Sequence, residues 1–238
     1  MNLLLLEHAD FIDSNRILLY ADDPRARHIA SVLDAQIGDS LRVGELHGNV
    51  GSGIIVQRND THIELSVTLN QSPPAKLPLT VLLALPRPKM MRRILRTVAE
   101  MGVQRLILLN TYKVEKSYWS SPAIAVETAQ NYFREGLQQA RDTILPQLEF
   151  AKLFKPFAED KLPEIVSETT ALVAHPGDYP ACPVAMNKPC TLAIGPEGGF
   201  TGYEIKKLQE AGMKCVQMGP RILRVDTAVT SLIARLYC

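Results

Sequence analysis

Short apolar runs separated by glycine-containing segments fill the first third of the chain. They are Leu41-Arg42-Val43, residues 53–56 and residues 63–67. Apolar runs of this length with turn residues between them predict a small β barrel or sandwich. His47-Gly48-Asn49, between the first two runs, predicts a turn joining two strands. We therefore expect a β domain over residues 1–70.

The pattern changes after residues 71–78, which hold three prolines and resist both helix and central strand. We interpret this segment as a linker. Apolar runs then alternate with helical patterns, which predicts a parallel sheet with crossover helices and hence an α/β domain over residues 79–238. The expected strands are 79–85, 105–110, 171–174, 191–194 and 215–218, and the expected helices are 89–101, 122–141, 203–212 and 226–237.

The composition of the chain excludes disordered and fibrous proteins but does not distinguish among globular ones. The chain has 238 residues, of which 46% are hydrophobic and 21% charged, as in ordinary globular proteins and unlike disordered or fibrous ones. A formal net charge of +1 neither requires nor excludes nucleic acid, so local clusters of charge must decide.

The cysteines and the N-terminal residues indicate the compartment. The spacing of the cysteines fits neither a CxxC metal pair nor a disulfide framework, which favours free thiols in a reducing compartment and no metal. They are Cys182, Cys190, Cys215 and Cys238. The apolar segment 1–6 is too short for a signal peptide or a membrane span, so we expect a cytoplasmic protein without a membrane partner.

Two glycine-containing loops follow expected strands and precede expected helices, at residues 194–200 and 218–228. Ligands bind at such strand ends in parallel sheets, and glycine lets the backbone approach them closely. Thr201 and Glu204 have the spacing of a capping box, which fixes the start of the next helix. Neither loop matches the GxxxxGK[ST] or GxGxxG pattern, which disfavours nucleoside triphosphates and dinucleotides. A simple tight turn is the alternative for the first loop.

The two loops together carry a resemblance. Gly195-Pro196-Glu197-Gly198-Gly199-Phe200, followed one strand later by Gly219-Pro220-Arg221-Ile222-Leu223-Arg224-Val225-Asp226-Thr227-Ala228, resembles the paired signature of the ribosomal RNA small-subunit methyltransferase E family of the SPOUT superfamily. Arg27-His28, Val32-Leu33 and Gly38-Asp39 resemble its N-terminal domain, and Ala84-Leu85-Pro86 and residues 89–103 resemble its first catalytic strand and helix. The resemblance implies a PUA-like β barrel that binds RNA, a SPOUT α/β domain with a C-terminal deep trefoil knot, and a homodimer.

The same resemblance implies the reaction. The family transfers a methyl group from S-adenosylmethionine to N3 of a uridine in 16S ribosomal RNA within the small ribosomal subunit. The implied cofactor-binding residues lie in three segments of the α/β domain. They are Leu172, Val173, His175, Gly195, Pro196, Glu197, Gly198, Gly199, Phe200, Met218, Gly219, Ile222, Leu223, Thr227 and Ala228.

Three charged residues of these loops are candidates for catalysis. Arg224 would stabilise negative charge as N3 of uracil loses its proton. The alternative is a salt bridge from Arg224 to Glu197 or Asp226. Either carboxylate is a candidate general base, for which a raised pKa is needed. Asp226 or Thr227 is also a plausible helix cap.

A basic cluster opens the first helix of the α/β domain. It consists of Arg87, Lys89, Arg92, Arg93 and Arg96, four of which share a helix face. Clustered cations suit RNA phosphates, and we add further candidates from the rest of the chain. These are Arg16, Arg25, Arg27, His28 and Arg141. The alternative is a solvated helix face.

Other functions stay open at this stage. Asp34 stands where the family usually has a basic residue, and Asp226 where it usually has Glu, so methylation of another RNA uridine is an alternative. A non-catalytic RNA-binding factor for ribosome assembly, with the same fold, is a second. A flavodoxin-like enzyme with another nucleotide cofactor is a third.

Overall fold

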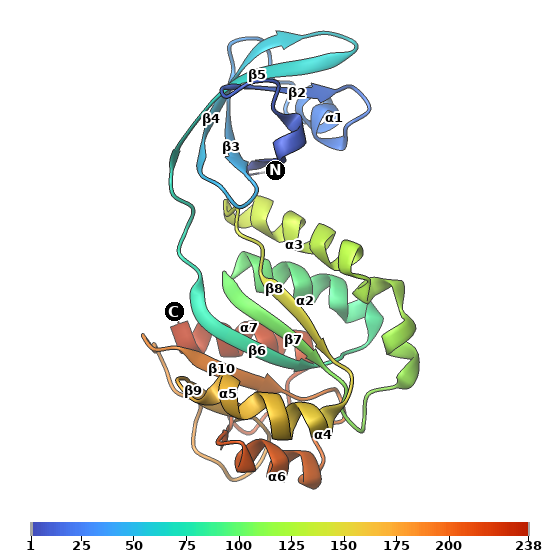
Figure 1. Cartoon of the computed structure of the whole chain (residues 1–238), viewed down its shortest axis with the longest axis vertical. Helices are drawn as coiled ribbons and strands as arrows, with labels where there is room; N and C mark the ends of the chain where they lie inside the picture. The colour runs from blue at the N-terminus through green and yellow to red at the C-terminus, as the bar shows by residue number, and fades with distance from the viewer. Residues whose placement is uncertain (1, 238) are drawn as a thin grey trace. The chain divides into compact units, whose positions relative to one another are not determined.

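A computed structural model describes residues 2–237 of the chain, which form two compact units. The first unit holds the residues up to Ala75 together with Arg134–Leu145, and the second holds Lys76–Phe133 and the residues from Pro146 on. Both are drawn in Figure 1. Cys182, Cys190 and Cys215 are buried free thiols, as predicted, whereas Cys238 lies outside the described residues.

The first unit is built on one five-stranded sheet with the order β1-β3-β4-β5-β2. Its elements are β1 (Leu4–Leu6), η1 (His8–Asp10), β2 (Arg16–Tyr20), α1 (Pro24–Ser31), β3 (Ser40–Glu45), β4 (Val50–Arg58) and β5 (His62–Gln71). Alternate residues of β5, Ile63, Leu65 and Val67, enter the core because successive side chains of a strand face opposite sides. The expected strands and the turn at His47-Gly48-Asn49 are confirmed.

Arg25 joins three segments of the first unit. Its guanidinium bonds Asp10 at 2.6 and 2.8 Å, Asp23 at 2.6 Å and the carbonyl oxygen of Leu5 at 3.0 Å. Burial disfavours its charge, but the hydrogen bonds with Asp23 and Asp10 outweigh that effect and raise the pKa of Arg25. This residue therefore stabilises the unit, and its guanidinium is already occupied by protein partners.

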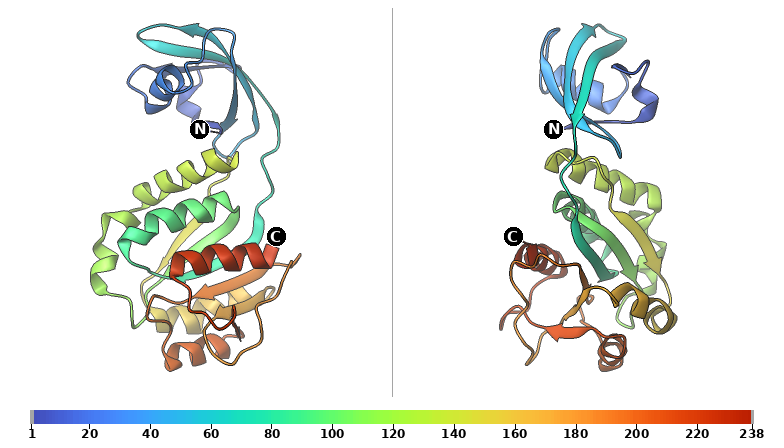
Figure 2. Two further views of the ribbon diagram at one scale, coloured as in Figure 1. Left: turned by 180° about the vertical axis from the view of Figure 1, so that it is seen from behind. Right: turned by 60° about the vertical axis from the view of Figure 1, so that its left-hand side comes forward.

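The second unit is an α/β fold with a parallel six-stranded sheet in the order β11-β9-β10-β6-β7-β8, which confirms the predicted class. Its strands are β6 (Leu77–Ala84), β7 (Val103–Leu109), β8 (Gln147–Ala151), β9 (Thr170–Ala174), β10 (Cys190–Ile194) and β11 (Lys214–Val216). The views of Figures 1 and 2 place α2 and α7 on one face of the sheet and α4, α5 and α6 on the other. Central strands such as β10 are buried along their whole length, because helices cover both faces.

The helices of the second unit follow the expected positions closely. They are α2 (Pro88–Glu100), α3 (Val126–Ala140), α4 (Phe154–Pro156), α5 (Leu162–Val166), α6 (Gly202–Glu210) and α7 (Val225–Tyr237), with shorter turns η2 (Lys116–Ser120), η3 (Pro122–Ile124) and η4 (Phe157–Lys161). The helix expected from residue 122 begins at Val126, because η3 forms a separate 3₁₀ turn. The strand β8 and the helical run from α4 to α5 were not predicted. No helix of residues 2–237 is long and apolar enough to cross a membrane.

The boundary between the units differs from the prediction in two respects. Strand β5 continues to Gln71 and β6 begins at Leu77, so the linker is shorter than residues 71–78. Residues 134–145 belong to the first unit rather than the second. Polar contacts explain this assignment, because Arg134 pairs with Glu7 at 3.2 Å and Thr143 Oγ1 donates to the carbonyl oxygen of Gly48 at 2.6 Å.

Replacing Arg25 with alanine should destabilise the protein by roughly 3 kcal/mol, because two carboxylates then lose their partner in a partly buried site. Urea unfolding measures the change. Arg27→Ala is the matched control on the same helix, since Arg27 is exposed and donates only to the carbonyl oxygen of Asp22. It should change stability by no more than about 0.5 kcal/mol. Equal effects of the two variants would contradict the role given to Arg25.

Candidate active site

A cavity of about 460 Å³ lies at the carboxyl ends of three neighbouring strands of the second unit. This volume is in the range of sites for small organic ligands. Its walls come from the ends of β9, β10 and β11, the loops that follow them, and α7. The lining residues are Ala174, His175, Pro176, Ile194, Gly195, Pro196, Glu197, Gly198, Gly199, Val216, Gln217, Met218, Gly219, Arg221, Ile222, Leu223, Arg224, Val225, Ala228 and Leu232.

Strand register explains why these loops meet. In β9, Ala174 pairs with Ile194 of β10 on one side and with Val216 of β11 on the other. The three strands therefore end at the same level, and the chain leaves each of them into one crevice. The two glycine-containing loops identified in the sequence therefore face a common crevice.

Most residues predicted to bind a cofactor line the cavity. They are His175, Gly195, Pro196, Glu197, Gly198, Gly199, Met218, Gly219, Ile222, Leu223 and Ala228. Four predicted residues do not line it. Leu172 and Val173 are buried inside β9, Phe200 is buried beside Gly195, and Thr227 is exposed on α7.

Several lining residues were not predicted from the sequence. Val216 is the last residue of β11, so the exact strand end would have identified it, whereas Ala174 and Ile194 fall within the segments 172–175 and 194–200 that the sequence indicated. The side chain of Gln217 accepts a hydrogen bond from the backbone of Gly219, which fixes the start of the second loop. Leu232 lies two turns into α7 and becomes part of the wall only through the packing of that helix. No sequence pattern marks Leu232.

The first loop is a tight turn and a cavity wall at once. Gly199 donates to the carbonyl oxygen of Pro196 at 2.7 Å and has φ +69°, a backbone region that favours glycine. A Cβ atom on Gly195 would lie 3.1 Å from the backbone nitrogen of Phe200. Thr201 and Glu204 form the predicted capping box directly after the loop. The turn interpretation and the ligand interpretation are therefore compatible.

A segment after β7, which the sequence did not indicate, holds the first loop in place. The ammonium of Lys113 donates to the carbonyl oxygen of Gly198 at 2.6 Å. Its neighbour Tyr112 donates its backbone N–H at 2.6 Å to Glu204, whose side chain is almost fully buried. A single carboxylate thus caps α6 and anchors the neighbouring loop. The first loop is constrained from two sides before any ligand binds.

The imidazole of His175 forms part of the cavity wall and is half-buried. Burial, and then the nearby charge of Lys113, lower the pKa of His175 below its usual value of 6.5. The ring is therefore mostly neutral at neutral pH. It adds no positive charge to the cavity.

Three charged residues that we predicted to act in catalysis have different surroundings. Arg224 lines the cavity and forms no ion pair with any residue in the described range 2–237. The predicted alternative, a salt bridge to Glu197 or Asp226, is therefore wrong. Glu197 instead accepts from the backbone N–H of Arg87 at 3.2 Å, and the two side chains approach to 3.9 Å. Asp226 pairs with Arg93 at 2.8 Å.

Asp226 does not line the cavity, and its side chain is only 8% exposed. Its carboxylate accepts from Arg93 and, at 3.0 Å, from the backbone N–H of Thr227 in the first turn of α7. Burial opposes ionisation, but the hydrogen bonds from Arg93 and Thr227 lower the pKa of Asp226 overall. A general base needs a raised pKa, so these surroundings favour an anchor for the start of α7.

The basic cluster of α2 shares an exposed helix face, as its spacing predicted, yet most of its cations have protein partners. Arg87 and Arg93 pair with the two carboxylates described above. The guanidinium groups of Arg92 and Arg96 lie over the ring of Tyr132, 5.9 and 5.7 Å from its centroid. The cluster therefore supports the packing around the cavity as well as any contact with RNA.

The predicted RNA contacts of the first unit also divide into paired and unpaired groups. Arg25 is held by Asp10 and Asp23, and Arg16 pairs with Asp13 and Glu64. The half-buried His28 has a buried Nε2 atom that bonds no described residue. Arg141, in contrast, is exposed. RNA binding by these residues stays a prediction.

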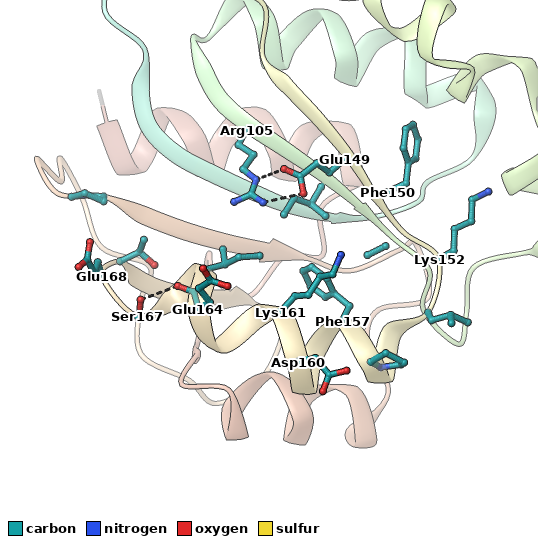
Figure 3. A pocket seen from close by; sticks show the side chains of 17 residues that line it. Arg105, Glu149, Phe150, Lys152, Phe157, Asp160, Lys161, Glu164, Ser167 and Glu168 are labelled. Atoms are coloured by element: carbon teal, nitrogen blue, oxygen red, sulfur yellow. Dashed lines mark hydrogen bonds and ion pairs between the residues drawn. The ribbon is translucent and has the colours of Figure 1, made fainter.

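A larger cavity of about 940 Å³ lies between β7, β8 and the run from α4 to α5 (Figure 3). Arg105 bonds both carboxylate oxygens of Glu149 at 2.6 and 2.9 Å, and the other charged lining residues are Lys152, Asp160, Lys161, Glu164 and Glu168. None of the predicted cofactor or catalytic residues lines it. The smaller cavity, where two glycine-containing loops converge with Arg221 and Arg224, is therefore our candidate active site.

Comparison with known families and sequences agrees with this geometry. A family model described as an RNA methyltransferase domain matches residues 73–237. The chain is 27% identical to the ribosomal RNA small subunit methyltransferase E of Treponema pallidum, covering 98% of this chain and 90% of that protein. It is 24% identical to the ribosomal RNA small subunit methyltransferase E 1 of Borreliella burgdorferi, covering 96% and 94% of the two chains.

Solved structures share the fold over nearly the whole chain. A putative methyltransferase from Legionella pneumophila in complex with S-adenosylmethionine has a TM-score of 0.73 at 20% identity, covering 98% of this chain and 95% of that one. The ribosomal RNA small subunit methyltransferase E from Neisseria gonorrhoeae, bound to S-adenosylmethionine, has a TM-score of 0.72 at 20% identity with the same coverage. Both units thus have counterparts in solved structures.

Arg93→Ala should lower the free energy of unfolding by about 1 kcal/mol at neutral pH, a small value because Arg93 itself is mostly solvated. The pKa of Asp226 is lower in the folded protein than in the unfolded chain, where it is near 3.9. The ionised carboxylate therefore stabilises the folded state above pH 3.9, and this stabilisation is lost as the pH falls through the folded pKa. Urea unfolding at about pH 7 and pH 3 tests this. The difference between wild type and variant should be smaller at the lower pH.

Arg92→Ala is the matched control, because its guanidinium lies over Tyr132 and touches no titrating carboxylate in the structure. Its effect should not depend on pH in this range. A pH-independent effect of Arg93→Ala would refute the anchoring role of the Arg93–Asp226 pair.

Proposed function

Because the chain belongs to the RNA methyltransferase domain family, we propose that it transfers a methyl group from S-adenosylmethionine to N3 of a uridine in the RNA of the small ribosomal subunit. One observation carries the proposal: the two signature loops form the walls of a single cavity at adjacent strand ends. The names of the relatives support the substrate, since they are small-subunit ribosomal RNA methyltransferases.

The cavity fits S-adenosylmethionine in size and chemistry. Apolar side chains such as Met218, Ile222 and Leu223 suit the adenine ring and the aliphatic part of the methionine chain. Gly195 and Gly219 carry no side chain, which leaves backbone groups open to the polar parts of the cofactor. A neutral His175 keeps a positive charge away from a cationic sulfonium. These residues would hold the cofactor.

The cofactor supplies a methyl group activated by a cationic sulfur. The chain aligns the uridine with that methyl group, and alignment of this kind lowers a barrier strongly. Arg221 and Arg224 both line the cavity and form no ion pair within residues 2–237, and the guanidinium of Arg224 is our candidate to stabilise the negative charge on the uracil as N3 loses its proton. Glu197 is the carboxylate that lines the cavity and is therefore our candidate to accept the N3 proton, whereas Asp226 acts as an anchor.

We also propose the knot and the PUA-like barrel implied by the family resemblance. The support for the knot is a segment between β9 and β10 that packs against later parts of the chain. Ala181 bridges to Gln217, and the backbone N–H of Ala185 donates to the carbonyl oxygen of Arg235 at 3.0 Å. Such threading is rare in proteins. The support for the barrel is the small, mainly antiparallel sheet of the first unit.

A homodimer in the cytoplasm completes the proposal. The support for a dimer is Ile222, an apolar side chain that is 81% exposed at the mouth of the cavity, where a second copy would cover it. The support for the cytoplasm is the ribosomal substrate together with the buried free thiols.

Mass mapping of methylated uridines tests the function. Small-subunit RNA from cells that lack the gene should lose one N3-methyluridine, and the purified protein with S-adenosylmethionine should restore it. Calorimetry should show that the protein binds the cofactor. Loss of a modified uridine elsewhere would reassign the substrate. Unchanged RNA together with no cofactor binding would favour a non-catalytic assembly factor.

Arg224→Ala should reduce turnover by roughly 10²- to 10³-fold while cofactor affinity changes by less than about twofold, since the guanidinium acts on charge that develops only in the transition state. Single-turnover kinetics and calorimetry measure the two quantities. Arg224→Lys is the matched variant and should recover part of the rate by retaining the positive charge. Weak cofactor binding with normal turnover at saturation would place Arg224 at the cofactor instead.

A further inference from the structure

A groove of about 420 Å³ lies on the first unit, away from any residue used above except Arg141. It is bounded by β3, the start of β4, the end of β5 and the residue that follows α3. Its lining combines two arginines with hydroxyl and amide groups and has no carboxylate and no aromatic ring. The lining residues are Ser40, Leu41, Arg42, Val50, Gly51, Ser52, Asn70, Gln71 and Arg141.

Arg141 stands at a backbone position that favours glycine. Helix α3 ends at Ala140, and the N–H of Asp142 donates at 3.0 Å to the carbonyl oxygen of Leu137, which is the pattern of a Schellman motif. Arg141 has φ +60°, in the left-handed region. A side chain other than glycine costs about 1 kcal/mol there. A long cation has been kept where the fold alone would prefer glycine.

The backbone shapes the floor of the groove at Gly51. The β4–β5 pairing shifts register between Val50 and Gly51, which marks a bulge. A Cβ atom on Gly51 would lie 1.8 Å from the carbonyl oxygen of Thr68, so no other residue fits this backbone. Gly51 therefore contributes backbone alone to the lining of the groove.

Both arginines of the groove are electrostatically unsatisfied. Within residues 2–237, neither Arg42 nor Arg141 forms an ion pair, in contrast to Arg16 and Arg25 of the same unit. The carboxylate of Asp142, next to Arg141 in the chain, accepts two backbone N–H groups, those of Thr143 and Ile144. It does not neutralise its neighbour.

We propose that this groove binds the ribose–phosphate backbone of the RNA substrate. Arginine forks suit phosphate oxygens, and the hydroxyl and amide groups suit phosphates and the 2′-hydroxyls of ribose. The lack of aromatic rings excludes stacking of bases as the main interaction. The groove therefore contributes affinity and position, while the cavity of the second unit performs the chemistry. This inference rests on the proposed function, because it takes RNA as the substrate.

Arg141→Gly separates a role in RNA binding from a role in the fold. The glycine relieves the left-handed strain, so the melting temperature should stay the same or rise. RNA affinity should nevertheless fall about fivefold at moderate salt, and the slope of log K against log salt should shrink by about 1. Fluorescence anisotropy with transcribed small-subunit ribosomal RNA measures both. Arg42→Gln should act in the same direction, and the double variant should lose about 2 from the slope.

The control is Lys206→Gln, which removes an exposed cation of α6 that lies beside Glu210. It should leave affinity and salt slope unchanged. A methyl-transfer assay distinguishes RNA binding by the groove from the proposed function. The double variant should have a raised KM for RNA. Its turnover at saturating RNA and its affinity for the cofactor should equal those of the wild type. If both arginine variants bind RNA with the wild-type slope, the groove is not a binding site. If the wild-type protein itself neither binds nor methylates the RNA, the proposed function fails first.

Discussion

The active site depends on three parallel strands that end at one level. Because Ala174 pairs with both Ile194 and Val216, the loops after β9, β10 and β11 leave the sheet side by side. A shift of one residue in either pairing would move a glycine-containing loop by about 3.3 Å and exchange the faces of its strand. The cavity is thus a product of sheet register. The loops supply its surface, but hydrogen bonding between strands decides that they meet.

Charge pairing then decides which residues of this cavity are available for chemistry. Helix α2 supplies one cation to each loop: Arg87 reaches Glu197 in the first, and Arg93 reaches Asp226 beside the second. Arg224 therefore forms no ion pair with either acid, although its charge helps to lower the pKa of Asp226. This arrangement links the basic helix to the active site through structure. Part of the positive charge that sequence reasoning assigned to RNA keeps the loops in place instead.

Features that depend on local sequence patterns could be predicted from the sequence. Alternating strands and helices predicted the parallel sheet, and the capping box at Thr201 and Glu204 predicted where α6 begins. The sequence was insufficient where distant segments meet. Lys113 touches Gly198 across 85 positions, and Thr143 reaches Gly48 across 95, so no spacing reveals either contact. The assignment of residues 134–145 to the first unit follows from such contacts, and so does the wall position of Leu232.

Arginines show most clearly why residue type alone does not identify a binding surface. Arg25 and Arg141 were both candidates for RNA contact in the sequence. In the structure the first is bonded to two carboxylates, whereas the second has no ion-pair partner in the described chain and stands in a backbone conformation that opposes its side chain. A paired guanidinium must break its bonds before it meets a phosphate, and an unpaired one need not. Ion pairs within the unit therefore account for Arg25, whereas the guanidinium of Arg141 is available to the RNA backbone that we propose for its groove.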